Sequence, residues 1–296
     1  MNDFWILLTA ALVACSCSLL GCFLVLRRMA MIGDAISHSV LPGIVIAFLL
    51  SGSRDSFFMM LGASVIGLVT VFLIQLFQQS GVQSDASIGV VFTALFSVGV
   101  VLVSVFTRQV DLDLDCVLYG EIIRVPWDTI TWAGIDIGPK AVWSLGLVLL
   151  LSLTVLGLFY KQFKLCSFDP AMAAAVGIPV ALFHYLLMGL VSVTTVASFE
   201  SVGAILVVGM LVVPAATAYL LTERLGVMIV YSMGIGVLSS TGGYYISVWL
   251  DASIAGCMIT AAGVLFVVAL LFSPTHGVVW RKLKQRQDVL AAGQAG

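Results

Sequence analysis

Asp34 and His38 are the residues of this chain whose types and spacing best suit chemistry. They lie four residues apart in a hydrophobic segment, so on a helix both side chains would share one face. A carboxylate and an imidazole are suitable ligands for a borderline cation such as Mn²⁺, Fe²⁺ or Zn²⁺. Ionisable side chains are costly inside a membrane and usually face a pathway or a partner. The alternative is that the two side chains bond only to each other and to neighbouring helices.

Proline residues follow this pair and recur in a later apolar segment. Pro42 lies four residues after His38. Because proline has no N–H group, the carbonyl of His38 loses its helical partner and becomes available to a ligand or a water. We therefore expect a kinked helix at this point. Pro214 should free the carbonyl of Met210 in the same way and give its own span a hinge.

The composition is that of a polytopic helical membrane protein. The 296 residues are 61% hydrophobic and only 9% charged, which is too little charge for the solvated surface of a globular protein. An apolar stretch of about 20 residues is long enough to cross a membrane. The second and eighth candidate spans carry polar residues and could be broken, so eight spans is an alternative to nine. The candidate spans are residues 4–26, 32–50, 57–77, 88–106, 141–160, 178–197, 201–221, 225–248 and 253–272.

The basic residues predict how the chain is oriented, because Lys and Arg are enriched on the cytoplasmic side of membrane spans. With the N-terminus outside, most of the 13 basic residues fall on the inner side. The C-terminal tail at residues 275–296 is then cytoplasmic. The long outer loop at 107–140 is acidic, and it either attracts cations or is an ordinary solvated loop.

The inner loop between the fifth and sixth spans contains signals for a short helix. Asp169 is a good N-cap, Pro170 suits the first helical position, and Gly177 is a natural C-terminal stop. A small helix at 169–177 on the cytoplasmic face suits the docking of a partner. A mere connector between two spans fits the same pattern.

Two other ionisable residues lie near the ends of predicted spans. Glu200 is either a metal ligand at the outer entrance or an interfacial residue in contact with water, and we favour the second interpretation. His184 lies near the cytoplasmic end of its span. It is either a ligand at the exit or, as we expect, a hydrogen-bonded residue of the helix bundle.

Several stretches of the chain together resemble the membrane subunits of ABC importers for manganese, zinc and iron. The most specific part is the combination of Arg-Arg-Met, Gly-Asp-Ala, Ser-His and Leu-Pro-Gly within residues 25–43. One departure is Cys116, where a histidine is expected in close relatives. The stretches are residues 25–43 (VLRRMAMIGDAISHSVLPG), 87–104 (SIGVVFTALFSVGVVLVS), 110–121 (VDLDLDCVLYGE), 168–177 (FDPAMAAAVG), 198–218 (SFESVGAILVVGMLVVPAATA) and 273–277 (SPTHG).

The resemblance implies an all-α fold of eight or nine spans like that of the cobalamin and iron-siderophore permeases, in a single domain over residues 1–296. It implies two permease chains, identical or related, around a pathway through the bacterial cytoplasmic membrane. Asp34 and His38 would line that pathway. Two cytoplasmic ATPase subunits would each receive the helix at 169–177, and an extracellular metal-binding protein would dock on the outer face. The cargo would be a divalent ion of manganese, zinc or iron, with no permanently bound cofactor.

Other classes of function fit the residues less well. The chain has no phosphate loop, so we expect it to be no enzyme and assign ATP hydrolysis to a partner subunit. A permease for a metal chelate or a cobalamin-like ligand is the alternative, and it would need a wide, aromatic-lined cavity. A secondary carrier would transport without an ATPase. An intramembrane metalloenzyme is disfavoured because no His-Glu-x-x-His motif occurs, and the net charge of −2 does not indicate nucleic-acid binding.

Overall fold

The computed structural model describes residues 2–51, 56–106, 122–132 and 135–273, and most of these are helical. Within these ranges nine segments are long and apolar enough to span a membrane, which confirms the prediction of nine spans. They consist of α1 (Asn2–Leu26), the pair α2 (Met31–Ser39) and α3 (Leu41–Ser51), α4 (Ser56–Gln79), α5 (Ser84–Phe106), α7 (Lys140–Leu158), α10 (Val180–Val202), α11 (Ala204–Leu221), α12 (Leu225–Leu250) and α13 (Ile254–Phe272).

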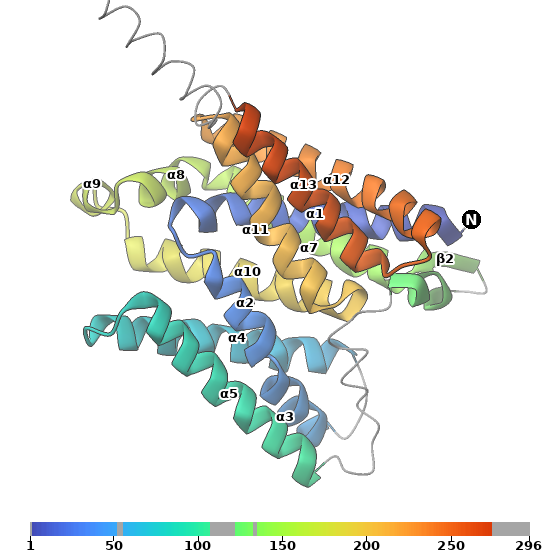
Figure 1. The fold of residues 1–296 in the computed structure, drawn as a ribbon. Coiled ribbons are helices and arrows are strands. Elements are labelled where there is room, and N and C mark those ends of the chain that lie inside the picture. The colour runs from blue at the N-terminus through green and yellow to red at the C-terminus, as the bar shows by residue number, and fades with distance from the viewer. Residues whose placement is uncertain (1, 52–55, 107–121, 133–134, 274–296) are drawn as a thin grey trace, which may run out of the picture.

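The spans form two groups that α10 connects (Figure 1). In the first group α11, α12 and α13 pack against one another, α1 packs against α11 and α12, and α7 packs against α1. The second group contains α2, α3, α4 and α5. α10 packs against α1, α7 and α11 as well as against α2 and α4, so it is in contact with both groups.

Small residues let several pairs of helices approach closely. A Cβ atom added at Gly43 of α3 would lie 2.5 Å from the carbonyl oxygen of Gly62 on α4. A Cβ at Gly21 of α1 would overlap the carbonyl of Leu211 on α11. Close backbone packing of this kind drives helix association in membranes, where lipid tails and apolar side chains are equally hydrophobic.

The second span is divided at Val40. The amide groups of Gly43 and Ile44 both donate to the Val40 carbonyl, at 2.9 Å and 3.1 Å, so a new helix begins there. Pro42 lies in the first turn of α3, where its missing N–H group costs no helical hydrogen bond. Pro214, by contrast, lies inside α11, which continues on both sides of it.

The eighth span is continuous although it contains consecutive Ser and Thr residues. Ser239 and Ser240 donate to the carbonyl of Gly236, at 2.9 Å and 2.8 Å, and Thr241 donates to that of Val237 at 2.9 Å. The hydroxyl groups are therefore satisfied within α12 itself, which explains why they do not interrupt it.

Some elements were not predicted. Gly203, with a φ of 80°, alone separates α10 from α11, so α10 runs further than the predicted sixth span. A helix α8 (Tyr160–Phe168) precedes the short α9 (Pro170–Ala175). The outer loop contains the 3-10 helix η1 (Ile122–Trp127) and the antiparallel strands β1 (Thr129–Trp132) and β2 (Ile135–Pro139). Cys116 and the tail at 275–296 lie outside the described residues.

Candidate metal site

Asp34 and His38 are the open positions on α2 after its first residue, the exposed Met31. From Ile32 to Ser39 all residues of α2 are buried except Asp34 and His38, whose side chains are 38% and 33% exposed. Nε2 of His38 lies 3.5 Å from Oδ1 of Asp34. That distance is longer than an ordinary hydrogen bond, so the two side chains are paired without being locked together. Both remain accessible to a ligand.

The neighbouring helices fix the orientation of α2. Ser39 and Thr70 share a hydrogen bond of 2.7 Å between α2 and α4. Gly33 allows close contact on the other side, since a Cβ there would overlap the side chain of Leu211 on α11. With two sides of α2 held in this way, the face that carries Asp34 and His38 is the one that stays open.

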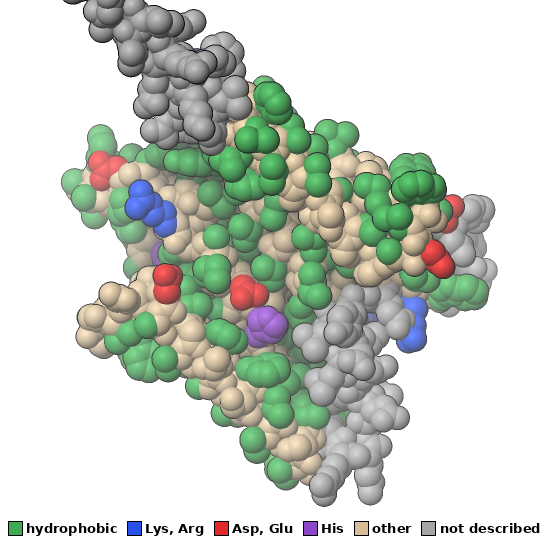
Figure 2. All heavy atoms as spheres, in the orientation of Figure 1, with side chains coloured by type: hydrophobic (Ala, Val, Ile, Leu, Met, Phe, Trp, Pro, Cys, Tyr) green, Lys and Arg blue, Asp and Glu red, His purple; other side chains and the backbone are tan. Residues whose placement is uncertain are grey.

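Two aromatic residues of α5 flank the imidazole. The ring centroid of His38 is 5.9 Å from that of Phe92 and 6.2 Å from that of Phe96. Neither phenylalanine was predicted as a site residue, although the two lie four residues apart in one of the family-like stretches. Figure 2 shows a histidine beside a carboxylate over α2, on a face where hydrophobic side chains predominate.

The described residues of one chain supply too few side-chain ligands for a complete metal site. Among the described residues, no group of three or more His, Cys, Asp and Glu side chains could hold a metal ion. Zinc usually takes four ligands, and manganese prefers octahedral coordination. Asp34 and His38 would therefore have to be completed by water, by backbone carbonyls or by another chain.

Glu200 is placed apart from this pair. It lies in the last turn of α10 with its side chain 53% exposed, and it forms an ion pair of 3.9 Å with Lys140 at the start of α7. It does not join Asp34 and His38 in a cluster of metal-ligating side chains.

His184 lies in the first turns of α10 and lines a pocket together with Arg27 and Arg28. A bound cation would be repelled by guanidinium groups in the same pocket, so this surrounding is unfavourable for a metal ligand. The ring of His184 is in edge contact with Tyr185, at 5.6 Å between centroids.

The helix α9 is capped at both ends. Oδ1 of Asp169 accepts a hydrogen bond of 2.9 Å from the amide of Met172, and Pro170 occupies the first helical position. At the other end Gly177, with a φ of 87°, donates to Ala174, and Ile178 donates to Ala173. These two bonds form a Schellman motif, which explains the glycine. Figure 1 shows α9 projecting from the edge of the bundle.

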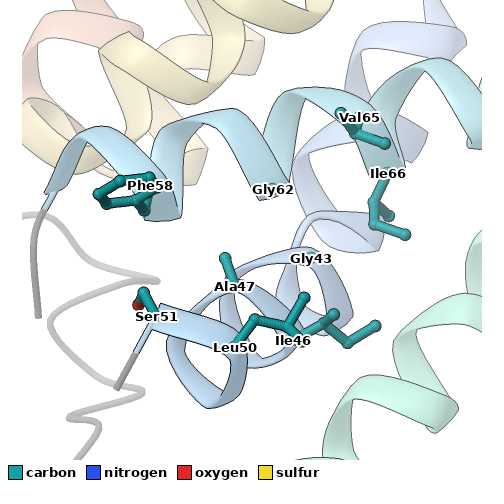
Figure 3. A pocket seen from close by; sticks show the side chains of 9 residues that line it. All are labelled: Gly43, Ile46, Ala47, Leu50, Ser51, Phe58, Gly62, Val65 and Ile66. Atoms are coloured by element: carbon teal, nitrogen blue, oxygen red, sulfur yellow. The ribbon is translucent and has the colours of Figure 1, made fainter. Parts of the chain in front are cut away.

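The pocket between α3 and α4 has a different character (Figure 3). Its volume is about 510 Å³, and glycine and aliphatic residues form most of its lining, with Phe58 as the aromatic residue and Ser51 as the hydroxyl. None of the described residues lining it is ionisable. They therefore offer no side-chain carboxylate, imidazole or thiol to a metal ion, and one aromatic residue among them does not make the aromatic-lined cavity that a cobalamin-like ligand would need.

Residues 3–273 match the ABC 3 transport family. The manganese transport system membrane protein MntD of Bacillus subtilis is 56% identical over 282 residues, which are 95% of this chain and 96% of that protein. The zinc transport system membrane protein TroD of Treponema pallidum is 44% identical over 282 residues, 95% of this chain and 77% of TroD.

A solved structure shows the same arrangement of helices. PsaBC from Streptococcus pneumoniae in complex with Fab matches with a TM-score of 0.79 and 31% sequence identity, covering 97% of this chain and 95% of the matched chain. The likeness therefore extends over almost the full length of both chains.

Proposed function

We propose a route for the metal ion through this chain, which belongs to the ABC 3 transport family and acts as a permease subunit of an ATP-driven importer. The relatives' names narrow the cargo to manganese or zinc, whereas the ligand types alone also admitted iron. The metal ion is the transported substrate and is not held permanently.

The observation that carries the proposal is the open pair Asp34 and His38 on the buried helix α2. A second permease chain with the same pair would raise the number of protein ligands to four, enough for Zn²⁺. For Mn²⁺, water or backbone carbonyls would fill the remaining positions. The long Asp34–His38 distance of 3.5 Å suits transport, because side chains that are not tightly bonded to each other are available to an ion, which must be bound weakly enough to leave the site.

The surface of α5 supports the presence of that second chain, identical or related. Phe96 and Val100, four residues apart on α5, are 37% and 43% exposed, and Phe96 borders the imidazole of His38. A contiguous exposed apolar surface on a membrane helix faces either lipid or another protein. Because the polar pair lies beside it, contact with a second chain would also remove Asp34 and His38 from lipid.

The partner that supplies energy would dock on α9. Phe168, Met172 and Val176 are 55%, 55% and 66% exposed around this capped helix. Apolar side chains on a short, rigid element outside the spans suit insertion into a groove of an ATPase subunit. We place α9 and the C-terminus in the cytoplasm and the N-terminus outside the bacterial cytoplasmic membrane, where a metal-binding protein would deliver the ion.

Helix contacts connect α9, where the ATPase would dock, with Asp34 and His38, where the metal ion would bind. α9 packs against α8 and α10, and α10 packs against α2. When ATP binding closes the ATPase subunits, displacement of α9 would therefore reach Asp34 and His38 through α10. The two ends of the pathway would open alternately, provided that ATP favours one of the two conformations.

The test is uptake of radiolabelled Mn²⁺ or Zn²⁺ by the complete transporter in proteoliposomes. Asp34→Ala and His38→Ala should each lower uptake by at least about tenfold, the size of effect expected from weakening a metal site. Glu223→Gln, which removes an exposed carboxylate between α11 and α12, is the matched control and should transport normally. Wild-type uptake by the two Ala variants at normal protein levels would exclude the proposed role.

A further inference from the structure

A second pocket, of about 510 Å³, lies where several spans end. Arg27 and Arg28 reach it from the turn after α1, Gln75 from the end of α4, Ser167 from α8 and His184 from the start of α10. None of the described residues that line it is acidic. The pocket therefore combines donors and positive charge at the depth where the spans leave the membrane.

The side chain of Arg27 is already held in place. Its Nε donates a hydrogen bond of 3.0 Å to Oγ of Ser167, and Ser167 donates in turn to the carbonyl of Phe163 at 2.7 Å. These bonds orient the guanidinium group and leave its two terminal nitrogens for other acceptors. A guanidinium fork oriented in this way matches two oxygens of a phosphate or carboxylate.

Polar atoms of this pocket lack partners within the described part of the chain. Nη2 of Arg27 and Oε1 of Gln75 are buried and have no hydrogen bond there. An unpaired buried polar atom costs about 1–3 kcal/mol. Since both residues line the pocket, a small rotation of Arg27 would let an occupant supply it with an acceptor, and a flip of the Gln75 amide would turn its NH₂ donor toward the same occupant.

Cys166, beside Arg27, does not neutralise it. Burial raises the pKa of the Cys166 thiol, although the nearby Arg27 acts in the opposite direction. The thiol is therefore neutral at physiological pH. Burial also lowers the pKa of the Arg27 guanidinium, but arginine remains charged in proteins. The positive charge of Arg27 thus has no carboxylate or thiolate to balance it among the residues that line the pocket.

Arg28 occupies a backbone conformation that normally selects glycine. Its φ is 56°, its amide donates to the carbonyl of Val25, and the amide of Met29 donates to that of Leu24. This is the helix-ending geometry in which glycine is preferred, and another residue there costs about 1–2 kcal/mol. Placing an arginine at this position brings a second cationic side chain to the pocket.

We propose that this pocket binds a phosphate-bearing anion, with Arg27 and Arg28 as the cationic contacts and Gln75, Ser167 and His184 as the polar ones. Two cationic residues and several other polar groups suit the many oxygens of a phosphate better than one carboxylate. Basic pockets between the cytoplasmic ends of membrane helices are also typical sites for anionic lipid headgroups. The bound anion would connect the end of α1 with α8 and α10, and hence with the segment that carries α9.

The experiment measures the melting temperature of the full chain in nanodiscs of three kinds. They contain phosphatidylcholine alone, phosphatidylcholine with phosphatidylglycerol, or phosphatidylcholine with inorganic phosphate in the buffer. The wild-type protein should melt at a higher temperature in the second or third kind. A rise with phosphatidylglycerol alone identifies a lipid headgroup, and a rise with inorganic phosphate identifies the free anion.

Two variants distinguish anion binding in the pocket from a general effect of charge at the membrane surface. Arg27→Lys keeps the charge but loses the fork, and it should weaken phosphate binding by roughly tenfold or more and remove most of the rise. Lys164→Gln, on an exposed position of α8 outside the pocket, is the matched control and should keep the rise. If Arg27→Lys does not fold, Gln75→Met provides the same comparison through the loss of one polar contact.

Three results would overturn the proposal. The first is equal melting of the wild-type protein in all three nanodiscs. The second is an equal loss of the rise in Lys164→Gln and Arg27→Lys. The third is the absence of any anion effect combined with failure of Arg27→Lys to assemble with the ATPase, which would identify an acidic side chain of that partner as the occupant. None of these results bears on metal uptake through Asp34 and His38.

Discussion

At the residue scale, the pair Asp34 and His38 combines two properties that rarely occur together in a membrane helix. Both side chains are ionisable, and both are about a third exposed on a helix whose other residues from Ile32 to Ser39 are buried. Ionisable residues inside a membrane are costly, so their retention on an open face is typical of a pathway for ions or protons. The aromatic rings of Phe92 and Phe96 limit access to His38 from the α5 side.

The chemistry of the imidazole predicts the pH dependence of uptake. Metal binding requires neutral imidazole, and the ordinary imidazole pKa is about 6.5. As the pH falls, a proton competes with the metal for His38, so uptake should decrease. The measurement is the initial rate of Mn²⁺ uptake into proteoliposomes between about pH 5.5 and 8.

Two variants complete that experiment. His38→Gln should show low uptake that no longer decreases at acidic pH, because the competing imidazole is gone. Glu223→Gln should keep the wild-type pH profile. An unchanged decrease in His38→Gln would show that another group is responsible.

The sequence predicted part of the site at this scale. The types and spacing of Asp34 and His38 are by themselves enough to indicate a possible metal ligand pair. The contribution of Phe92 and Phe96 could not be predicted in the same way, because it depends on how α5 packs against α2. The role of Arg27 was also missed, since a basic residue after a span equally indicates membrane orientation.

At the scale of elements, the contact between α3 and α4 depends on glycine. A Cβ atom at Gly62 would lie 2.6 Å from the carbonyl oxygen of Gly43 and 2.6 Å from Cβ of Ala47. Gly62→Ala should therefore destabilise the protein by about 1–3 kcal/mol, because the two backbones must separate. Thermal unfolding of the purified protein would show this as a lower melting temperature.

Gly263 on α13 provides the control for that variant. A Cβ atom there would meet no atom within 4 Å. Gly263→Ala should leave the melting temperature unchanged or raise it, because alanine is favoured over glycine inside a helix by about 0.5–1 kcal/mol. Equal effects of the two substitutions would contradict the packing described for α3 and α4.

The short helix α9 depends on its N-cap. Asp169→Ala removes the acceptor for the amide of Met172 and should cost about 0.5–2 kcal/mol of local stability. If α9 transmits motion from an ATPase, this variant should lower the metal uptake obtained per ATP hydrolysed. Asp169→Asn retains a capping side chain and should behave like the wild-type protein. If Asp169→Ala took up as much metal per ATP hydrolysed as the wild-type protein, the proposed role of α9 in transport would be contradicted.

The sequence predicted the spans better than their interruptions and connections. Long apolar stretches made nine spans recognisable, and Pro42 indicated a change of direction near the break at Val40. The strands β1 and β2 and the helix α8 were missed, because short elements outside the membrane have little hydrophobic periodicity. The link between α10 and α11 was predicted at residues 198–200 and lies instead at Gly203, because the polar residues Ser198, Glu200 and Ser201 belong to the last turns of α10.

At the scale of the whole molecule, two groups of helices meet at α10. This helix contacts both α2, which carries the metal ligand pair, and the capped helix α9. Within its described residues one chain provides the pair Asp34 and His38 and no larger group of metal-ligating side chains, and in the site that we propose a second permease chain supplies the other pair. Such an arrangement lets the site form and open as the chains move, which suits an ion that must be bound and then released.

The most direct test is the structure of the complete transporter with bound Mn²⁺ or Zn²⁺, with the ion located by its anomalous X-ray scattering. We predict a single metal peak between the two permease chains, with Asp34 and His38 of this chain at ligand distance, about 2.0–2.2 Å for Zn²⁺. A well-occupied metal site elsewhere in the membrane region, with Asp34 and His38 facing lipid, would contradict the account.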